Sequence, residues 1–186
     1  MKHFILPLFL LAGWVTRTEA QLFLTQEEAL AHAFSDSQNI QRKTAFLTQE
    51  QVEAIQKLAN TKVESQLITY YHDATAGPAT TYAFFEKNLV RTKEEILMIV
   101  LDAQGRVRFV EILAFYEPLD YLPTSKWLLL FRSALLTPNL WPGRDIHNVT
   151  GATLTTQAVT AAVRKTLATF KIAVAPEPRA NVRNGS

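Results

Sequence analysis

The chain has 186 residues, of which 48% are hydrophobic and 19% are charged, a composition typical of one folded globular domain. Its formal net charge is only +2 and no basic run exceeds two residues, which disfavours nucleic-acid binding. The absence of cysteine excludes disulfides, iron–sulfur clusters, thioether-linked haem, thiolate zinc sites and a lipid-modified N-terminal cysteine. Any electron-carrying role therefore requires a different cofactor.

Residues 1–20 have the three-part organisation of a secretory signal peptide. Lys2 and His3 precede an apolar run over residues 4–15, and residues 16–20 follow, with Thr18 and Ala20 at the two small-residue positions of a cleavage site. As a helix the run would span about 18 Å, which is short of a hydrocarbon core of about 30 Å. We therefore predict cleavage after Ala20 and secretion across the cytoplasmic membrane into the periplasm. The alternative is membrane association through an uncleaved N-terminus.

Two predicted helices in the N-terminal helical part, residues 21–65, begin with the same pattern. In each, a threonine (Thr25 or Thr48) is followed three residues later by Glu28 or Gln51, which is the capping-box arrangement. The spacing predicts helices at about 26–35 and 49–60, with a weak strand at 39–46 between them. The apolar residues expected to face inward are Ala29, Leu30, Ala33 and Phe34 in the first helix and Val52, Ile55, Leu58 and Ala59 in the second.

From residue 66 onward the pattern is that of β-strands. Residues 67–71 and 80–85 are rich in aromatic and β-branched side chains, and a hairpin is predicted from strands 96–101 and 106–115 joined by a turn at 102–105. The first hairpin strand is apolar on both faces, so we expect a central strand in a sheet covered on both sides. In the second strand, one shared face is expected to hold Val107, Phe109, Leu113 and Phe115.

These elements predict an α+β fold in a single domain, with an antiparallel or mixed sheet and helices packed on it. A short buried helix is expected at 124–131, and a longer one in the second half of the stretch 145–171. The inward face of the longer helix is formed by Val159, Ala162, Val163, Leu167 and Phe170, whereas Arg164, Lys165 and Lys171 are expected to point elsewhere. The tail 175–186 has no apolar period and is expected to be disordered.

Hydroxyl groups and very small residues gather where the chain enters this last helix. They are Thr150, Gly151, Ala152, Thr153, Thr155 and Thr156. The first turn of a helix has unpaired backbone N–H groups and lies at the positive end of the helix dipole. The stretch therefore suits a phosphate group.

The segment 150–155, Thr-Gly-Ala-Thr-Leu-Thr, resembles the flavinylation motif of the FMN-binding domain family. This family includes subunits of the membrane redox complexes Rnf and Na⁺-translocating NADH:quinone reductase, and many secreted bacterial flavoproteins. The predicted hairpin, Glu117 with Pro118, and the terminal helix follow in the family's order, so the resemblance covers roughly residues 80–172. It implies an FMN-binding domain at 66–174, with FMN joined to Thr153 through a phosphodiester bond made by a dedicated flavin transferase.

The resemblance also implies a function. The chain would be a secreted or periplasmic electron-transfer flavoprotein with covalent FMN, rather than a substrate-converting oxidoreductase. Its partners would be the flavin transferase and a redox partner protein or membrane electron-transfer complex. The small and hydroxyl residues around Thr153 would support the cofactor, and further candidates for flavin contact are His147, Glu117, Tyr116, Trp127 and Trp141.

Several alternatives remain beside this interpretation. The family usually has Asp three residues before the motif, where this chain has His147, and the nearby acidic residue is Asp145. This departure motivates a binding module of the same fold without flavin. In another alternative, an envelope structural protein, the threonines only cap a helix. Glu117 could simply end a strand, the aromatic candidates could pack in the core, and no histidine pair has metal-ligand spacing, so no metal site is predicted.

Overall fold

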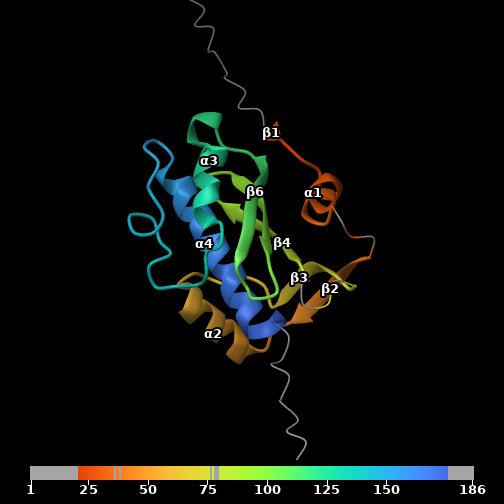
Figure 1. Ribbon diagram of the computed structural model, residues 1–186. Coiled ribbons are helices and arrows are strands. Elements are labelled where there is room, and N and C mark those ends of the chain that lie inside the picture. The colour runs from red at the N-terminus through yellow and green to blue at the C-terminus, as the bar shows by residue number, and fades with distance from the viewer. Residues whose placement is uncertain (1–20, 36, 38, 76, 78–79, 176–186) are drawn as a thin grey trace, which may run out of the picture.

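The computed structural model describes residues 21–35, 37, 39–75, 77 and 80–175 (Figure 1). The predicted signal peptide 1–20, with its cleavage site after Ala20, lies outside the described residues, as does the tail after Ala175. The helices are α1 (Gln26–Ala33), α2 (Gln49–Ala59), α3 (Ser125–Leu128) and α4 (Thr153–Thr169). The strands are β1 (Gln21–Leu22), β2 (Ile40–Phe46), β3 (Leu67–Asp73), β4 (Tyr82–Leu89), β5 (Glu94–Leu101) and β6 (Val107–Phe115).

In the described part of the chain, the six strands form one antiparallel sheet in the order β1-β6-β5-β4-β3-β2. With the four helices packed around it, this sheet confirms the predicted α+β fold in a single domain. The two-residue strand β1 was not predicted, because two residues are too few to show the alternation of apolar and polar side chains that marks a strand. None of the described helices is both long enough and apolar enough to cross a membrane.

Both predicted capping boxes are present. Thr25 Oγ1 accepts from the backbone N–H of Glu28 at 3.2 Å, and a Glu28 carboxylate oxygen accepts from the N–H of Thr25 at 2.8 Å. Thr48 and Gln51 make the same reciprocal pair at 3.2 and 2.9 Å. α2 ends one residue earlier than predicted because Asn60 takes the left-handed conformation, with φ of 52°.

The inward faces of α1 and α2 are largely as predicted. The buried residues are Ala29, Ala33 and Phe34 for α1 and Val52, Ile55 and Ala59 for α2. Leu30 is only partly buried. The prediction for Leu58 was wrong, since this side chain is 38% exposed. It lies one residue before Ala59, which completes the buried stripe, and so it points about 100° away from that stripe.

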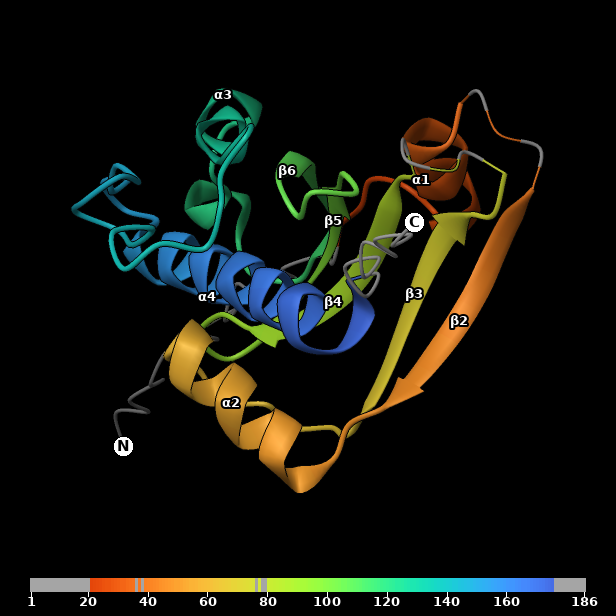
Figure 2. The same ribbon diagram turned by 60° about the horizontal axis from the view of Figure 1, so that its bottom comes forward.

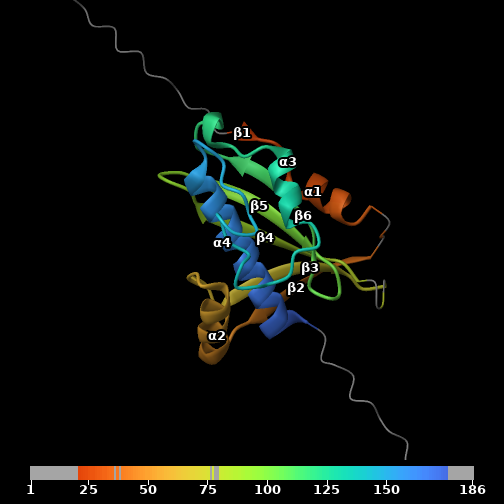
Figure 3. The ribbon, with the colours of Figure 1, turned by 60° about the vertical axis from the view of Figure 1, so that its left-hand side comes forward.

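β5 is the central strand that its apolar sequence predicted. Leu97, Ile99 and Leu101 pack in the same core cluster as α4, whereas Met98 and Val100 pack in the cluster that includes α1. Figure 3 shows α4 and α1 on opposite faces of the sheet. The sheet is therefore covered on both sides at β5.

The prediction of one shared apolar face along β6 was wrong. Val107 and Phe115 pack on the α4 side of the sheet, whereas Phe109 and Leu113 pack on the α1 side. The pairing with β5 shifts register twice and skips Arg108 and Leu113. Each extra residue is a β-bulge that reverses the alternation of side chains, which a strict period of two cannot anticipate.

α4 crosses one face of the sheet, and α2 packs beside α4 (Figure 2). The residues predicted to face inward are all buried: Val159, Ala162, Val163, Leu167 and Phe170. α2 packs against the C-terminal part of α4 through a cluster that includes Ile55 and Ala168. The helix continues into a π-helical turn at Phe170–Val174.

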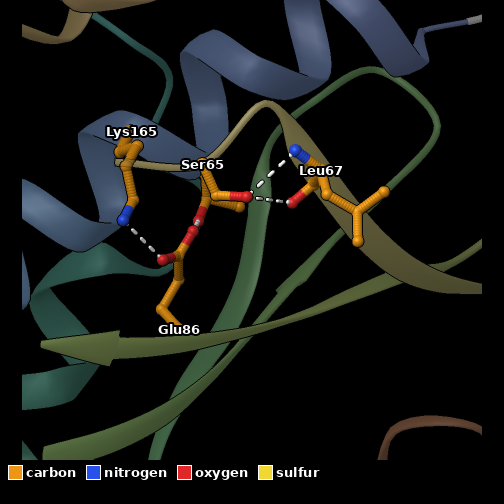
Figure 4. Close-up of polar contacts among 5 residues, drawn as sticks. Ser65, Leu67, Glu86 and Lys165 are labelled. Carbon is orange, nitrogen blue, oxygen red and sulfur yellow. Dashed lines mark hydrogen bonds and ion pairs between the residues drawn. The ribbon is translucent and has the colours of Figure 1, made fainter. Parts of the chain in front are cut away.

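Figure 4 shows an ion pair between α4 and β4 and a local contact at the start of β3. Lys165 Nζ lies 2.7 Å from a carboxylate oxygen of Glu86, an ion pair that joins α4 to β4. At the start of β3, the Ser65 hydroxyl accepts from the N–H of Leu67 at 3.0 Å and donates to the carbonyl oxygen of Leu67 at 3.1 Å. The ion pair ties the last helix to the sheet, whereas the Ser65 contact is local to the start of β3.

Candidate functional site

A tight turn leads into α4. The N–H of Ala152 donates to the carbonyl oxygen of Val149 at 3.0 Å, and Gly151 within this turn has φ of 83°. Only glycine adopts that conformation without strain. No described atom lies within 4 Å of a Cβ built at Gly151, so the requirement for glycine comes from the backbone conformation and not from lack of space.

The N-terminus of α4 is open. The N-cap residue is Ala152, which provides no side-chain cap, and the first turn holds no acidic residue. The helix ladder begins with the N–H of Thr156, which donates to the carbonyl oxygen of Ala152 at 2.9 Å. The amides of the preceding residues Thr153, Leu154 and Thr155 therefore lie at the positive end of a 17-residue helix, a favourable place for an anion.

The threonine hydroxyls of the motif divide into two sets. Thr155 is 1% exposed and donates to the carbonyl oxygen of Tyr121 at 2.8 Å, and Thr156 is 0% exposed and donates to the carbonyl oxygen of Thr153 at 2.9 Å. Thr150 and Thr153 are exposed, and within the described structure neither hydroxyl has a hydrogen-bond partner. The first set fastens the start of the helix from inside, and the second is accessible from solvent.

Ala152 and His147 occupy different environments. Ala152 is 2% exposed, so its small side chain packs inside the protein and does not open a path toward the motif. His147, the departure from the family pattern, has an exposed side chain, and its carbonyl oxygen accepts from Trp127 Nε1 at 2.7 Å. The backbone before the motif is thus held in place, while the His147 side chain remains accessible.

Trp127 and Tyr116 were predicted as candidates for flavin contact. Trp127 is 6% exposed and packs edge to face against Phe131, with ring centroids 5.3 Å apart. It lies in the core cluster on the α4 side, and so it packs in the core and anchors the backbone of His147. Tyr116 is half-buried, and its N–H donates to the carbonyl oxygen of Glu94 at 3.1 Å at the end of the β5–β6 pair.

Glu117 holds the turn between β4 and β5. One of its carboxylate oxygens accepts from the N–H groups of Thr92, Lys93 and Arg91 at 2.7, 2.8 and 3.2 Å, and from the Thr92 hydroxyl at 3.3 Å. Burial opposes ionisation of this carboxyl, but the four donors together lower its pKa below the ordinary value.

This turn is linked to the start of α4. The guanidinium of Arg91 lies over the ring of Tyr121, 4.9 Å from its centroid, and the carbonyl oxygen of Tyr121 accepts from Thr155. Glu117 is therefore connected to the motif through two intervening residues. Arg91 is exposed and adds a positive charge to this neighbourhood.

A groove runs along the exposed face of α4 from the motif. This α4 groove has a volume of ≈ 650 Å³ and begins at Leu154, the residue after Thr153. Its other lining residues are Gln157, Ala158 and Ala161 of α4, Trp141, Pro142 and Arg144 of the preceding loop, Leu89 and Val90 after β4, and Asn60. Small and apolar side chains with one cation can accept a flat aromatic group that also carries polar atoms.

The wall of the α4 groove at Trp141 is braced by Arg164. The prediction that Arg164 points away from the core was wrong, because its side chain is 3% exposed. Nε donates to the carbonyl oxygen of Ala59 at 2.8 Å, Nη1 to that of Thr137 at 2.7 Å and Nη2 to that of Leu58 at 3.1 Å. The guanidinium also lies 4.7 Å from the centroid of the Trp141 ring.

The sequence contained a signal for this buried arginine. Thr156, Thr160 and Arg164 recur at every fourth residue, and all three are buried. Thr160 satisfies its hydroxyl within the helix by donating to the carbonyl oxygen of Thr156 at 2.7 Å. These three polar residues form a stripe beside the apolar stripe and indicate a second buried face of the helix. A description that divides the helix only into one apolar buried face and one polar exposed face overlooks it.

Histidines do not form a metal site in the described part of the chain, where no three His, Cys, Asp or Glu residues lie close enough to hold an ion. His32 Nδ1 lies 3.1 Å from a carboxylate oxygen of Glu111, and His72 stacks on Tyr82 with ring centroids 6.0 Å apart.

In comparisons with known proteins, no family model, no curated protein and no solved structure matched this chain. The candidate site is therefore defined by its own geometry. It consists of the exposed Thr153 hydroxyl, the open N-terminus of α4 and the adjacent α4 groove. Such an arrangement can bind a phosphate at the helix and an aromatic group beside it.

Proposed function

We propose that this chain is an exported, periplasmic electron-transfer protein that carries FMN through a phosphodiester bond to Thr153 Oγ1. The observation that carries the proposal is the exposed Thr153 hydroxyl at the uncapped first turn of α4. A phosphodiester at this position keeps one negative charge, which an exposed helix N-terminus stabilises by about 0.3–1 kcal/mol.

The α4 groove supplies the second support for the proposal. Leu154 and Trp141 offer apolar surface for the flat ring system of a flavin, and Arg144, which lines the same groove, offers a positive charge to its polar atoms. When bound, FMN supplies the redox chemistry. The role of the protein is to hold the ring, limit its contact with water and tune its potential.

Attachment of the flavin requires a separate enzyme. A threonine hydroxyl is a weak nucleophile at its free pKa. In the described structure no side chain accepts a hydrogen bond from Thr153 Oγ1, so the chain offers no base that would activate it. We infer that a flavin transferase provides this activation. Thr153 Oγ1 would attack the phosphorus of an FMN donor held by that enzyme, the bond from this phosphorus to the donor's leaving group would break, and the hydroxyl proton would pass to a base of the enzyme. Exposure of the motif serves to admit that enzyme. Electrons would pass between the flavin and a redox partner protein or a membrane electron-transfer complex.

The proposal is tested by producing the exported protein in a host with an active flavin transferase. The purified protein should be yellow and should retain the flavin absorbance after denaturation and gel filtration. Thr153→Val should abolish the covalent flavin, whereas Thr150→Val, which removes the other exposed hydroxyl, should keep the attachment. A wild-type protein that stays colourless while a known substrate of the transferase is modified in the same cells would refute the proposal.

A second candidate function is a binding or envelope structural module of the same fold without flavin. The observation that favours it is His147 at the position where the resembling family has Asp. The envelope alternative, in which the threonines only cap the helix, finds less support, because the N-cap of α4 is Ala152 and makes no side-chain cap. A His147→Asp variant separates the candidates, since flavin attachment gained only in this variant would assign the natural chain to the module without flavin.

A further inference from the structure

The outer edge of β6 is only partly paired. β1 pairs with the last two residues of β6, Ala114 and Phe115. At the other end of the strand, Val107 exchanges backbone hydrogen bonds with Ser133 and Ala134 at 2.8 and 3.0 Å. Between these contacts, residues 108–112 have no strand beside them within the described part of the chain. An open strand edge of this kind is a template for pairing with another chain.

The register shows which backbone groups point outward. Val107 uses its N–H and C=O on the outer edge, and its side chain packs on the α4 side of the sheet. Along a strand, successive residues direct their N–H and C=O groups to opposite edges and their side chains to opposite faces of the sheet. Residues whose side chains share the face of Val107 therefore direct their backbone groups to the same edge as Val107. Val110 and Ile112 also pack on the α4 side, so their N–H and C=O groups point to the open edge. Those of Phe109 and Glu111 point toward β5.

The open edge lies at the bottom of a groove. This β6 groove has a volume of ≈ 700 Å³ and is walled by Phe23 and His32 on the α1 side and by Leu128 and Leu129 on the α3 side. Figure 1 shows β6 lying between these two helices. Five strand residues extend for about 17 Å, so the groove has the length and the apolar walls to hold a short extended segment.

The charges of the β6 groove favour an acidic occupant. Arg108 and Arg132 line it and both are exposed, but Arg108 Nη1 donates to the Thr81 hydroxyl at 2.6 Å, so its guanidinium is directed toward β4. The one acidic lining residue, Glu111, lies 3.1 Å from His32 Nδ1. Arg132, whose guanidinium has no partner in the described structure, is the cation that attracts a segment whose outward side chains are carboxylates.

We propose that the β6 groove binds an extended acidic segment of a partner protein, which adds to the sheet as a strand beside β6. The outward N–H and C=O groups of Val110 and Ile112 supply main-chain hydrogen bonds, the apolar walls accept alternate side chains, and Arg132 selects acidic residues. Other occupants fit less well. The tail 176–186 carries two arginines against one glutamate, and a second copy of the chain brings the same two groove arginines.

The proposal is tested with an acetylated and amidated peptide of about eight residues that alternates valine with glutamate, and with the matched valine–lysine peptide as control. In hydrogen-exchange NMR, saturation with the acidic peptide should slow exchange of the Val110 and Ile112 amides by about tenfold or more, and leave Phe109 and Glu111 unchanged. Binding without this protection pattern, or equal affinity for both peptides, would overturn the proposal.

Two further measurements keep the result specific. Arg132→Glu should weaken acidic-peptide binding by about tenfold, while Arg42→Glu, an exposed arginine on the distant strand β2, should leave it unchanged. If both variants weaken peptide binding equally, the effect comes only from the overall charge of the protein, and binding of the peptide in the β6 groove is contradicted. If the same amides are protected without peptide but only at high protein concentration, the occupant is a second copy, and the proposed partner is wrong.

Discussion

Arg164 Nε donates a hydrogen bond of 2.8 Å to the carbonyl oxygen of Ala59, the last residue of α2. The last carbonyl groups of a helix have no partner within the helix, and a cation at this end also complements the helix dipole. Arg164 bonds Leu58 as well, so one guanidinium from the middle of α4 closes the C-terminus of α2. The two helices depend on this residue for their packing.

Replacing Arg164 should therefore destabilise the fold. Arg164→Met leaves several buried carbonyl groups without donors, and we expect the free energy of unfolding to fall by about 3 kcal/mol. Arg164→Lys should lose about 2 kcal/mol, because an ammonium cannot reproduce the planar fork. Urea denaturation followed by circular dichroism measures both changes. Lys171→Met, at an exposed position near the end of the same helical segment, is the control and should change stability by less than about 0.5 kcal/mol.

Glu95 should make stability fall as the pH rises. This side chain is 0% exposed, and among the described residues neither carboxyl oxygen has a hydrogen-bond partner. Burial raises the pKa of Glu95 from 4.5 to about 8, and the nearby Asn88 amide offsets only part of this increase. The folded state therefore holds a proton that the unfolded state releases above pH 4.5, and this contribution to stability is lost as the pH rises toward 8.

The corresponding measurement compares the wild type with Glu95→Gln from pH 5 to pH 8. The wild type should lose about 3 kcal/mol relative to the variant over this range. Glu94→Gln, which alters the exposed neighbour paired with Lys87 at 2.8 Å, should retain the wild-type pH dependence. Parallel stability curves for the wild type and Glu95→Gln would show that Glu95 is not a buried neutral acid.

Glu117 should have the opposite pH dependence. Its pKa is lowered in the folded state, so its contribution is present above the ordinary carboxyl pKa and is lost as the pH falls through the lower, folded value. At pH 7, Glu117→Gln should cost about 2 kcal/mol, because the turn 91–93 loses a charged acceptor. The difference from the wild type should disappear in acid, as measured by denaturation at pH 2 to 7. A constant difference would contradict the ionised state of Glu117.

The motif threonines should separate into residues needed for stability and residues needed for modification. Thr155→Val removes the hydrogen bond to Tyr121 and should destabilise the unmodified protein by about 1 kcal/mol. Thr153→Val should change stability by less than about 0.5 kcal/mol, since the side chain is exposed and does not cap the helix. Thermal unfolding of both variants in a host without flavin transferase makes the comparison. A large loss in Thr153→Val would instead favour a structural role for this hydroxyl.

The elements with strong local signals could be predicted from the sequence. The capping boxes at Thr25 and Thr48 mark the starts of α1 and α2, and the unbroken apolar run of β5 marks a central strand. The features that were missed depend on the tertiary structure. The bulges of β6 arise from its pairing with β5, and the burial of Arg164 depends on carbonyl groups more than 100 residues earlier in the chain.

The candidate site was also predictable only where its signals are local in the sequence. The motif and the start of α4 are local, and the positive φ of Gly151 agrees with the glycine found there. The division between buried and exposed threonines required the position of Tyr121, and the α4 groove required segments from four parts of the chain. Spacing along one helix carries no information about these neighbours.

The measurement that tests the central claim most directly is peptide mapping of the exported protein by mass spectrometry. Trypsin cuts after Arg144 and Arg164, so one peptide, 145–164, contains every motif hydroxyl. In a host with an active flavin transferase, this peptide should gain the mass of FMN less one water, and fragmentation should place the added mass on Thr153. An unmodified 145–164 peptide in such a host, or added mass on another residue, would contradict the account.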